Sequence, residues 1–445
     1  MQILDSASFH PTRLAVIGTG YVGIASMIGF AEIGNTVVGY DILPDRIRDL
    51  KRGRAPYHEA GLSEALARHL QSGAVSFTDD LSDAVDGARF IIVAVGTPTT
   101  SSGSADLTAV EAVFCSLAEL DLQGALVVLR STVPPGTCDR FAELLRDNAE
   151  IVYSPEFLRE GTAVADFLNP DRIVIGGRSE AAMLRYAELL SPLGRQTLIM
   201  SPPNAELAKG MSNAFLAMKI SFANQVANLC DRLDADALEV LDAVGSDRRI
   251  GRQFLHPGIG FGGPCFEKDL KSLIHLSKRL DVDCDLLSAT LAVNDRQPTR
   301  IASILQAELG RPVRGMRLGA WGLTFKGGTD DVRDSLAVRV VEDLASKGAE
   351  IVAYDPAFRD ANHTLPCRLA TTALDAADAE TLLILTDWPQ FRSIDMRSVA
   401  QRIRTGLVVD GRNMLDGDSV AAAGLRYRGI GRRRESEATV LAEAG

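Results

Sequence analysis

Two hydrophobic patterns alternate along the first half of the chain. Short, continuous apolar runs are typical of strands buried on both faces, and each is followed by a segment with apolar residues at helical spacing. The predicted strands are residues 13–17, 36–40, 90–95, 126–129, 151–153 and 172–176. Strands that alternate with helices in this way predict a parallel sheet with crossover helices, and therefore an α/β fold.

The same alternation returns after residue 310. A strand is expected at 317–322, a loop at 323–333, a helix at 336–347 and a strand at 350–354 that ends in Asp355. Further strands are expected at 382–385 and 407–410. This order repeats that of residues 13–41 but lacks its glycine turn, because Lys326 and Arg333 stand where the glycines would be. Basic side chains at that turn indicate a different phosphate-bearing ligand.

Between the two α/β segments lies a helical pattern from residue 204 to about 233. Pro202 and Pro203 are expected to prevent an earlier start, and Asn204 is suited to be the N-cap. A helix of this length spans roughly 45 Å, which is more than one domain needs. We therefore expect it to bridge two domains or to form a dimer interface, with helical structure continuing to about residue 309.

The predicted fold class is α/β, with two Rossmann-like, doubly wound parallel-sheet domains joined by the long helix and a helical middle domain. The expected domains are 1–203 for a dinucleotide, 204–309 as the central helical and dimerisation domain, 310–431 for a different phosphate-bearing ligand, and 432–445 as a mobile tail. A chain of 445 residues is too long for one core, which agrees with this division.

The composition indicates which partners and which cellular compartment to expect. A net charge of −11 argues against nucleic acid or an anionic membrane as the main partner. The six cysteines are widely spaced, which fits a reducing cytoplasm and predicts no metal site. Neither a signal-peptide pattern nor an apolar run of about 18 residues occurs, so a soluble, cytoplasmic protein is expected.

A glycine turn follows the first predicted strand. Gly18, Gly20 and Gly23 form G-x-G-x-x-G, which lets a pyrophosphate approach a helix N-terminus. Asp41 ends the second strand, where a carboxylate accepts hydrogen bonds from ribose hydroxyls and repels a 2′-phosphate. Asp41 therefore favours NAD over NADP. Arg46 keeps NADP open, but it is expected to pack along the adenine.

The second notable stretch, residues 258–270, surrounds Cys265 with four preceding glycines and with Lys268 and Asp269 close behind. Glycines allow a ligand to lie against the main chain, and an ammonium or a helix N-terminus favours the thiolate. Helical spacing resumes at Asp269, so Cys265 is expected at or just before a helix start. The alternative is a glycine loop with a buried structural cysteine.

Polar groups also follow the predicted strands and lie on the long helix. Glu156 and Glu160 would share a face if their stretch formed a helical turn. Lys209 and Asn213 are one turn apart on the long helix, where they form either a solvated stripe or catalytic groups on a rigid scaffold.

Taken together, these motifs resemble the UDP-glucose/GDP-mannose dehydrogenase family, and its UDP-glucose-oxidising members most closely. The resemblance extends from Arg13 to about Gly431. The motifs that carry it are residues 18–23, 131–137, 155–160, 209–213, 260–269, 325–333 and 410–412. It implies a four-electron oxidation of the sugar C6 alcohol to a carboxylate with two NAD⁺. It also implies that residues 1–203 bind NAD and that residues 310–431 bind a UDP-sugar, namely UDP-glucose.

The resemblance also implies roles for individual residues. The implied catalytic residues are Cys265 as nucleophile, Lys209, Asp269, Asn213, Glu156 and Thr132. The implied cofactor-binding residues are Gly18, Gly20, Tyr21, Val22, Gly23, Asp41, Arg46, Thr97, Thr132, Glu160, Lys268 and Arg333. The implied substrate-binding residues are Glu156, Phe157, Leu158, Glu160, Lys209, Asn213, Arg249, Phe254, Gly262, Phe266, Lys326 and Arg412, with Arg249 supplied by a neighbouring subunit.

Three alternatives remain open from the sequence. The same chemistry could act on GDP-mannose or a UDP-N-acetyl hexosamine. A two-electron NAD-dependent hydroxyacid dehydrogenase would leave Cys265 as packing, and a non-catalytic nucleotide-sugar-binding regulator would bind without turnover. The expected working unit is a homodimer or a higher homo-oligomer.

Overall fold

The computed structural model describes residues 11–146, 148–358 and 364–432. The predicted tail at 432–445 lies almost entirely outside them. The chain forms two compact units, of which the first comprises residues 1–212 and 271–282 and the second residues 213–270 and 283–445. The boundary between them falls within two helices, α9 (Pro202–Leu233) and α11 (Phe266–Arg279). The division into three sequence domains stays a prediction.

The first unit contains an eight-stranded sheet in the order β3-β2-β1-β4-β5-β6-β7-β8. Its strands are β1 (Arg13–Ile17), β2 (Thr36–Tyr40), β3 (Val75–Thr78), β4 (Phe90–Val93), β5 (Leu126–Leu129), β6 (Glu150–Tyr153), β7 (Ile173–Gly177) and β8 (Thr197–Met200). All neighbours are parallel except β6 and β7, which pair antiparallel and so depart from the expected all-parallel sheet. Both faces are covered, because Leu14 and Val16 enter one apolar cluster while Ala15 and Ile17 enter another.

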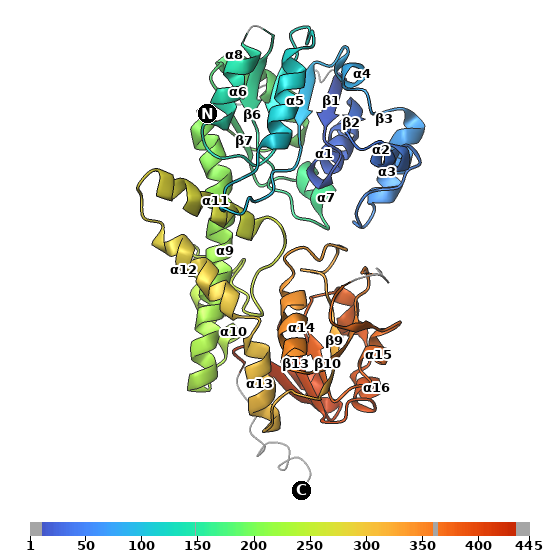
Figure 1. The fold of residues 1–445 in the computed structure, drawn as a ribbon, viewed down its shortest axis with the longest axis vertical. Coiled ribbons are helices and arrows are strands. Elements are labelled where there is room, and N and C mark those ends of the chain that lie inside the picture. Colours follow the sequence, from blue (N-terminus) through green and yellow to red (C-terminus); the bar gives the residue numbers. More distant parts are fainter. Residues whose placement is uncertain (1–10, 147, 359–363, 433–445) are drawn as a thin grey trace. The chain divides into compact units, whose positions relative to one another are not determined.

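Helices connect these strands, as Figure 1 shows. They are α1 (Tyr21–Glu32), α2 (Pro44–Lys51), α3 (Leu62–Ser72), α4 (Leu81–Val85), α5 (Thr108–Ala118), α6 (Thr137–Leu145), α7 (Ala163–Leu168), α8 (Glu180–Leu189) and the 3₁₀ turn η1 (Ser191–Leu193). The first unit is therefore the doubly wound domain that the hydrophobic pattern predicts.

The second unit contains a six-stranded parallel sheet in the order β11-β10-β9-β12-β13-β14. Its strands are β9 (Arg317–Trp321), β10 (Glu350–Tyr354), β11 (Arg368–Leu369), β12 (Thr381–Ile384), β13 (Leu407–Asp410) and β14 (Arg426–Gly429). Its other elements are α10 (Ala237–Gly245), α12 (Asp285–Arg296), α13 (Arg300–Leu309), α14 (Leu336–Ser346), α15 (Ala373–Ala376), η2 (Pro389–Ser393), α16 (Met396–Ala400) and α17 (Gly417–Ala422). The predicted second Rossmann-like unit is thus present.

The long helix α9 begins earlier than expected. It starts at Pro202, and the N–H of Ala205 donates to the carbonyl of Ser201. Proline is tolerated in the first helical turn because the N–H groups there have no partner within the helix. The prediction that the two prolines exclude an earlier start was therefore wrong, although the end at Leu233 agrees.

The two sheets share a local hydrogen-bonding arrangement at the end of their first strand. The N–H and hydroxyl of Thr19 both donate to Asp41 Oδ2 at 2.9 Å, and those of Thr324 both donate to Asp355 Oδ2 at 3.0 Å. Gly18 and Gly322 precede these threonines by one and two residues; both have a positive φ and donate their N–H to the last residue of the second strand. An aspartate at the end of the second strand therefore holds the first loop in both sheets.

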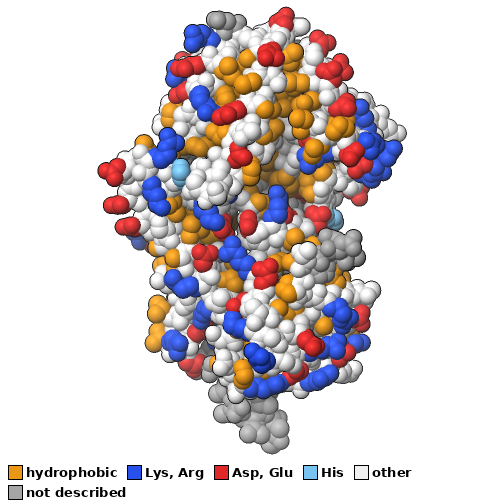
Figure 2. All heavy atoms as spheres, in the orientation of Figure 1, with side chains coloured by type: hydrophobic (Ala, Val, Ile, Leu, Met, Phe, Trp, Pro, Cys, Tyr) orange, Lys and Arg blue, Asp and Glu red, His pale blue; other side chains and the backbone are white. Residues whose placement is uncertain are grey.

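On the face drawn in Figure 2, basic and acidic side chains are interspersed. Within the described ranges, no helix combines the length and the apolar composition that crossing a lipid bilayer requires.

Candidate active site

The glycine turn between β1 and α1 is built to receive an anion. Gly18 has a φ of +92°, which favours glycine, and a Cβ on Gly23 would collide with the carbonyl oxygen of Gly18. Tyr21 and Val22 open α1, and no side chain among the described residues caps this helix. Its first N–H groups therefore remain directed at the turn, where a pyrophosphate would meet them and the helix dipole. These features fit a dinucleotide.

Asp41 is more deeply engaged than its expected ribose contact requires. Its carboxylate is 5% exposed and accepts from Thr19, from the N–H of Leu43 at 3.1 Å and from Arg46 at 3.0 Å. Burial raises the pKa of Asp41, but hydrogen bonds from Thr19, Leu43 and Arg46 outweigh it, so the net pKa is lowered. The group stays ionised at neutral pH, and Arg46 is ion-paired with it.

The loops after β4 and β5 are tied to each other. Thr97 donates its hydroxyl to the carbonyl of Thr132 at 2.8 Å, and Ser131 donates to the carbonyl of Val95 at 2.7 Å. The carboxylate of Glu206 on α9 accepts from the N–H groups of Gly136 at 2.6 Å and Cys138 at 2.7 Å. Glu206 therefore fixes the start of α6 and the end of the loop that carries Thr132.

Glu156 and Lys209 form a buried ion pair in the first unit. Their charged atoms lie 3.1 Å apart, and the side chains are 9% and 4% exposed. Burial raises the pKa of Glu156, but the Lys209 ammonium and the N–H of Leu158 more than compensate, so the pKa is lowered overall. The ammonium also lies 5.3 Å from the centre of the Phe157 ring. A solvated stripe is thereby excluded for Lys209.

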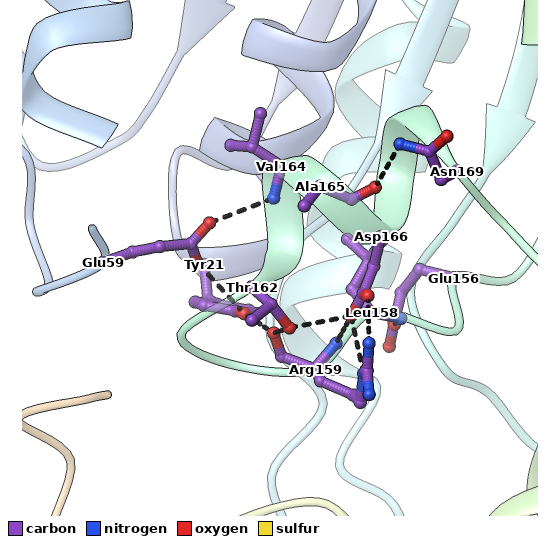
Figure 3. Close-up of polar contacts among 10 residues, drawn as sticks. All are labelled: Tyr21, Glu59, Glu156, Leu158, Arg159, Thr162, Val164, Ala165, Asp166 and Asn169. Carbon is purple, nitrogen blue, oxygen red and sulfur yellow. Dashed lines mark hydrogen bonds and ion pairs between the residues drawn. The ribbon is translucent and has the colours of Figure 1, made fainter. Parts of the chain in front are cut away.

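The stretch from Glu156 to Glu160 is a loop and not the helical turn considered from the sequence. Leu158 donates its N–H to Glu156 at 2.6 Å, and Tyr21 donates its hydroxyl to the carbonyl of Arg159 at 2.5 Å (Figure 3). The loop is therefore held from the dinucleotide turn as well as from within.

In the second unit, Cys265 stands immediately before α11, as predicted. Its carbonyl accepts the N–H of Asp269 at 3.0 Å, the first hydrogen bond of the helix, and its side chain is exposed. A helix N-terminus stabilises a thiolate by its dipole. The alternative of a buried structural cysteine is excluded, whereas the nucleophilic role stays a prediction.

Asp269 gathers two of the other predicted residues of the second unit. It is 3% exposed, and its carboxylate accepts from the Asn213 amide at 2.6 Å and from the Lys268 ammonium at 2.7 Å. Asn213 is itself buried, so it is not part of a solvated stripe. Lys268 is paired with Asp269, and its expected place near the cofactor stays a prediction. The amide of Asn213 is thereby oriented by a charged acceptor.

The glycines before Cys265 face protein atoms. Cβ atoms on Gly262 and Gly263 would lie 2.6 Å from the carbonyl oxygen of Asp334 and 2.7 Å from the Phe325 ring. These two glycines therefore pack closely against the second sheet's loops, and the expected approach of a ligand to the main chain stays a prediction. Asn294 holds the same loop, accepting from the N–H of Phe261 at 2.8 Å and donating to its carbonyl at 3.0 Å.

Arg412, expected to bind substrate, holds three loops of the second unit together. Its guanidinium donates to the carbonyls of Leu385 at 2.8 Å, Gly260 at 3.2 Å and Phe325 at 2.9 Å. Asp387 accepts from the N–H of Gly327 at 3.0 Å. Burial raises the pKa of Asp387, but Arg412, this N–H and Lys326 lower it overall. Arg412 and Lys326 therefore place positive charge at this loop end, beside the ionised Asp387.

Three further predicted residues, Arg249, Phe254 and Arg333, lie in loops of the second unit. Arg333 is ion-paired with Asp331, and Arg249 is ion-paired with Asp247 and highly exposed. Phe254 has a φ of 64°, a strained conformation for a bulky residue, and its ring lies 6.4 Å from that of Phe266. Strain of this kind is concentrated at functional sites.

Sequence reasoning missed several residues that shape the site. Glu206, Asn294 and Asp387 lie outside the motif cores and act through loop backbone or through other side chains. Glu206 precedes Lys209 by one turn on α9, and this spacing was the available signal. Among the described residues, no cluster of histidine, cysteine or carboxylate side chains could hold a metal ion.

The glycine turn and the aspartate after β2 define a Rossmann-type NAD-dependent oxidoreductase, and the second sheet adds a second nucleotide-binding unit. Family models agree along the chain: the NAD binding domain of the UDP-glucose/GDP-mannose dehydrogenase family matches residues 12–193, its central domain 203–296 and its UDP binding domain 319–417. The chain belongs to the UDP-glucose/GDP-mannose dehydrogenase family.

Relatives with this similarity span nearly the whole chain. A UDP-glucose 6-dehydrogenase of Rhizobium meliloti is 40% identical over 94% of this chain and 99% of its own. A UDP-glucose dehydrogenase structure from Pyrobaculum islandicum is 38% identical, with a TM-score of 0.87 over 97% of this chain and 100% of that one. A UDP-D-ManNAc dehydrogenase from Pyrococcus horikoshii is 30% identical, with a TM-score of 0.81 over 94% of this chain and 99% of that one.

Proposed function

We propose that the protein oxidises UDP-glucose to UDP-glucuronate with NAD⁺, in two successive two-electron steps. The observation that carries this proposal is the exposed Cys265 at the start of α11, with Asp269 one turn later holding Asn213. The names of the most similar relatives support UDP-glucose over other nucleotide sugars, since identity is 38–40% to two UDP-glucose enzymes and 30% to an enzyme for UDP-D-ManNAc.

The chemistry requires a nucleophile for the second oxidation. Bound NAD⁺ supplies a hydride acceptor for each step. After the first step, the Cys265 thiolate adds to the C6 aldehyde and forms a thiohemiacetal, whose C–H can give up a second hydride. The resulting thioester is cleaved by water, which restores the thiol and releases the carboxylate. One acid, two NADH and the accompanying protons are formed per substrate and water consumed.

Side chains near the chemistry assist without a histidine. The Lys209 ammonium, which is ion-paired with Glu156, is suited to stabilise a developing C6 oxyanion and to exchange its proton. Asn213, oriented by Asp269, adds an amide donor, and each well-placed donor contributes roughly 3–4 kcal/mol to the transition state. Thr132 is proposed to order the hydrolytic water.

Binding roles complete the proposal. Lys326 and Arg412 are proposed to set the charge around the nucleotide diphosphate, with Phe157, Leu158, Glu160, Phe254, Gly262 and Phe266 around the sugar. Arg412 acts here by fixing the loops around Gly260 and Phe325. Arg333 and Lys268 are proposed to lie near the cofactor. A cytoplasmic location is proposed because NAD⁺ and nucleotide sugars are supplied there.

We also propose a homodimer formed through α9. Phe215, Phe222, Leu229 and Leu233 are 58%, 48%, 61% and 74% exposed. At about 100° per residue these four positions fall within roughly 40° of one another around the helix axis. Such an exposed apolar stripe is typical of an interface. Lys219 on the same helix donates to the carbonyls of Ile250 and Gly251 and so positions the Arg249 loop, which is proposed to reach the partner's substrate.

The test counts NADH with a panel of UDP-glucose, GDP-mannose and UDP-N-acetyl hexosamines. UDP-glucose is expected to give the highest kcat/KM and two NADH per acid. Cys265→Ala is expected to abolish acid formation with NADH binding unchanged, because an exposed cysteine contributes little packing. Cys265→Ser is expected to accumulate a uronyl ester detectable by protein mass. One NADH per substrate, or acid formation by Cys265→Ala at the wild-type rate, would refute the proposal.

A further inference from the structure

The loop that follows β6 is a compact structure held by its own side chains (Figure 3). Asp166 accepts from the Arg159 N–H at 2.8 Å and from its guanidinium at 2.6 Å and 3.0 Å, and also from the Thr162 hydroxyl at 3.1 Å. Glu156 accepts from Leu158 within the same loop. These internal hydrogen bonds are expected to keep the segment from Glu156 to Asp166 together as one rigid body.

Tyr21 links this loop to the dinucleotide turn. It is the first residue of α1, directly after Gly20, and its hydroxyl donates to the carbonyl of Arg159 at 2.5 Å. Tyr57 secures it from behind, donating its hydroxyl to the Tyr21 carbonyl at 3.2 Å with the two rings 4.7 Å apart. Burial, followed by the charge of Glu59, raises the pKa of Tyr21 well above its usual range. The hydroxyl therefore remains a donor.

Glu59 adds a second link at the same place. It is 7% exposed, and its carboxylate accepts the N–H of Val164 at 3.0 Å, in the first turn of α7. Its other oxygen lies 3.5 Å from the Tyr21 hydroxyl. Leaving a buried carboxylate without such partners costs free energy. Glu59 therefore holds the far end of the loop against Tyr21, the first residue of α1.

We propose that Tyr21 and Glu59 are positioning residues that couple the dinucleotide turn to the sugar-binding loop, so that each ligand changes the affinity for the other. The proposal rests on the proposed function, since it takes residues 156–160 to contact the sugar. A ligand that moves Tyr21, or holds it in place, changes the position of Arg159 through the Tyr21 hydroxyl and that of Val164 through Glu59. Coupling between two ligands is a free energy and must be the same in both directions.

The experiment measures binding and not turnover. NADH and UDP-glucose form a ternary complex that cannot react further, so their mutual effect can be read by calorimetry. Kd for UDP-glucose is measured with and without saturating NADH, and Kd for NADH with and without saturating UDP-glucose. The two ratios are expected to agree at about fivefold or more in the wild type. UDP alone is expected to give a smaller ratio, because it lacks the sugar.

Two variants and one control isolate the link. Tyr21→Phe removes only the hydroxyl, and Glu59→Leu removes the carboxylate that accepts the N–H of Val164. Both are expected to bring the ratio to within about twofold of one, and the double variant to add little, since the two act as a unit. Tyr186→Phe, a fully buried tyrosine outside this loop, is expected to retain the wild-type ratio.

The outcomes distinguish a failure of this inference from a failure of the proposed function. A wild-type ratio near one, or an unchanged ratio in Tyr21→Phe, overturns the coupling while leaving UDP-glucose binding intact. No binding of UDP-glucose by the wild type overturns the proposed function instead. A loss of the ratio in Tyr186→Phe equal to that in Tyr21→Phe also refutes the inference, because the effect would then be general loosening.

Discussion

Replacing Glu156 by glutamine leaves the shape of the side chain and its acceptor for Leu158 but removes the charge that faces Lys209. The two side chains are 9% and 4% exposed and their charged atoms are 3.1 Å apart. In the variant the ammonium remains buried without a counter-charge. The ring of Phe157, 5.3 Å from the ammonium, offsets only part of this cost.

The expected loss follows from that burial. Breaking a buried ion pair by removing one partner costs about 3–5 kcal/mol. For a domain of about 200 residues, 1 kcal/mol shifts Tm by roughly 2–4 °C, so Tm is expected to fall by about 6 °C or more. Lys209→Met is expected to destabilise in the same way, since it leaves Glu156 as an uncompensated buried carboxylate.

The assay compares Tm for the wild type, both single variants and Glu156→Gln/Lys209→Met at one pH. The double variant contains no uncompensated charge, so its Tm is expected to lie above that of either single variant. Activity is expected to be lost in all three, and stability therefore provides an independent readout. A Tm for Glu156→Gln within about 2 °C of the wild type would refute the reasoning. So would a double variant whose loss equals the sum of the single losses.

Two further predictions follow from other sites. Phe222→Glu is expected to place a charge in the exposed stripe of α9 and to give monomers in sedimentation, whereas Glu239→Gln, outside the stripe, is expected to leave the mass unchanged; a dimer of Phe222→Glu would contradict the interface. Burial raises the pKa of Glu206 to about 7, although hydrogen bonds from the N–H groups of Cys138 and Gly136 lower it. Because the unfolded pKa is about 4.3, the protonated form is favoured in the fold, and stability is lost as pH rises towards and through 7. The Tm of the wild type minus that of Glu206→Gln is therefore expected to fall from pH 5 to pH 8, and a constant or rising difference would exclude this assignment.

Much of the architecture was predictable because it depends on local and periodic signals. Buried strands such as β2 (Thr36–Tyr40) and β10 (Glu350–Tyr354) have the predicted bounds, since continuous apolar runs between turns have few alternatives in an α/β chain. The start of α9 was misjudged because Pro202 was treated as a helix breaker, although the first turn needs no N–H donor. The antiparallel pairing of β7 depends on chain direction in space, on which composition carries no information.

The site was predictable in its residue types and less so in its contacts. Cys265 stands at a helix start as the glycine pattern and the resumed helical spacing indicated. The partner of Asn213, however, is Asp269, which lies fifty-six positions away in the chain. The sequence also contained no sign that Arg412 donates to the carbonyl oxygens of Leu385, Gly260 and Phe325, while its expected role in substrate binding stays a prediction.

The aspartate that ends the second strand has a bearing on protein engineering. Cofactor preference in Rossmann enzymes is commonly redesigned by exchanging this acidic residue for a small or basic one. Here Asp41 also accepts hydrogen bonds from the backbone and hydroxyl of Thr19. Its counterpart Asp355 accepts the same two hydrogen bonds from Thr324, in a loop that lacks the G-x-G-x-x-G pattern. The Asp41 carboxylate therefore stabilises this loop in addition to its predicted contact with the ribose. A redesign aimed at NADP therefore needs a second substitution near Thr19 that restores an acceptor, or selectivity will be gained at the expense of a loosened turn.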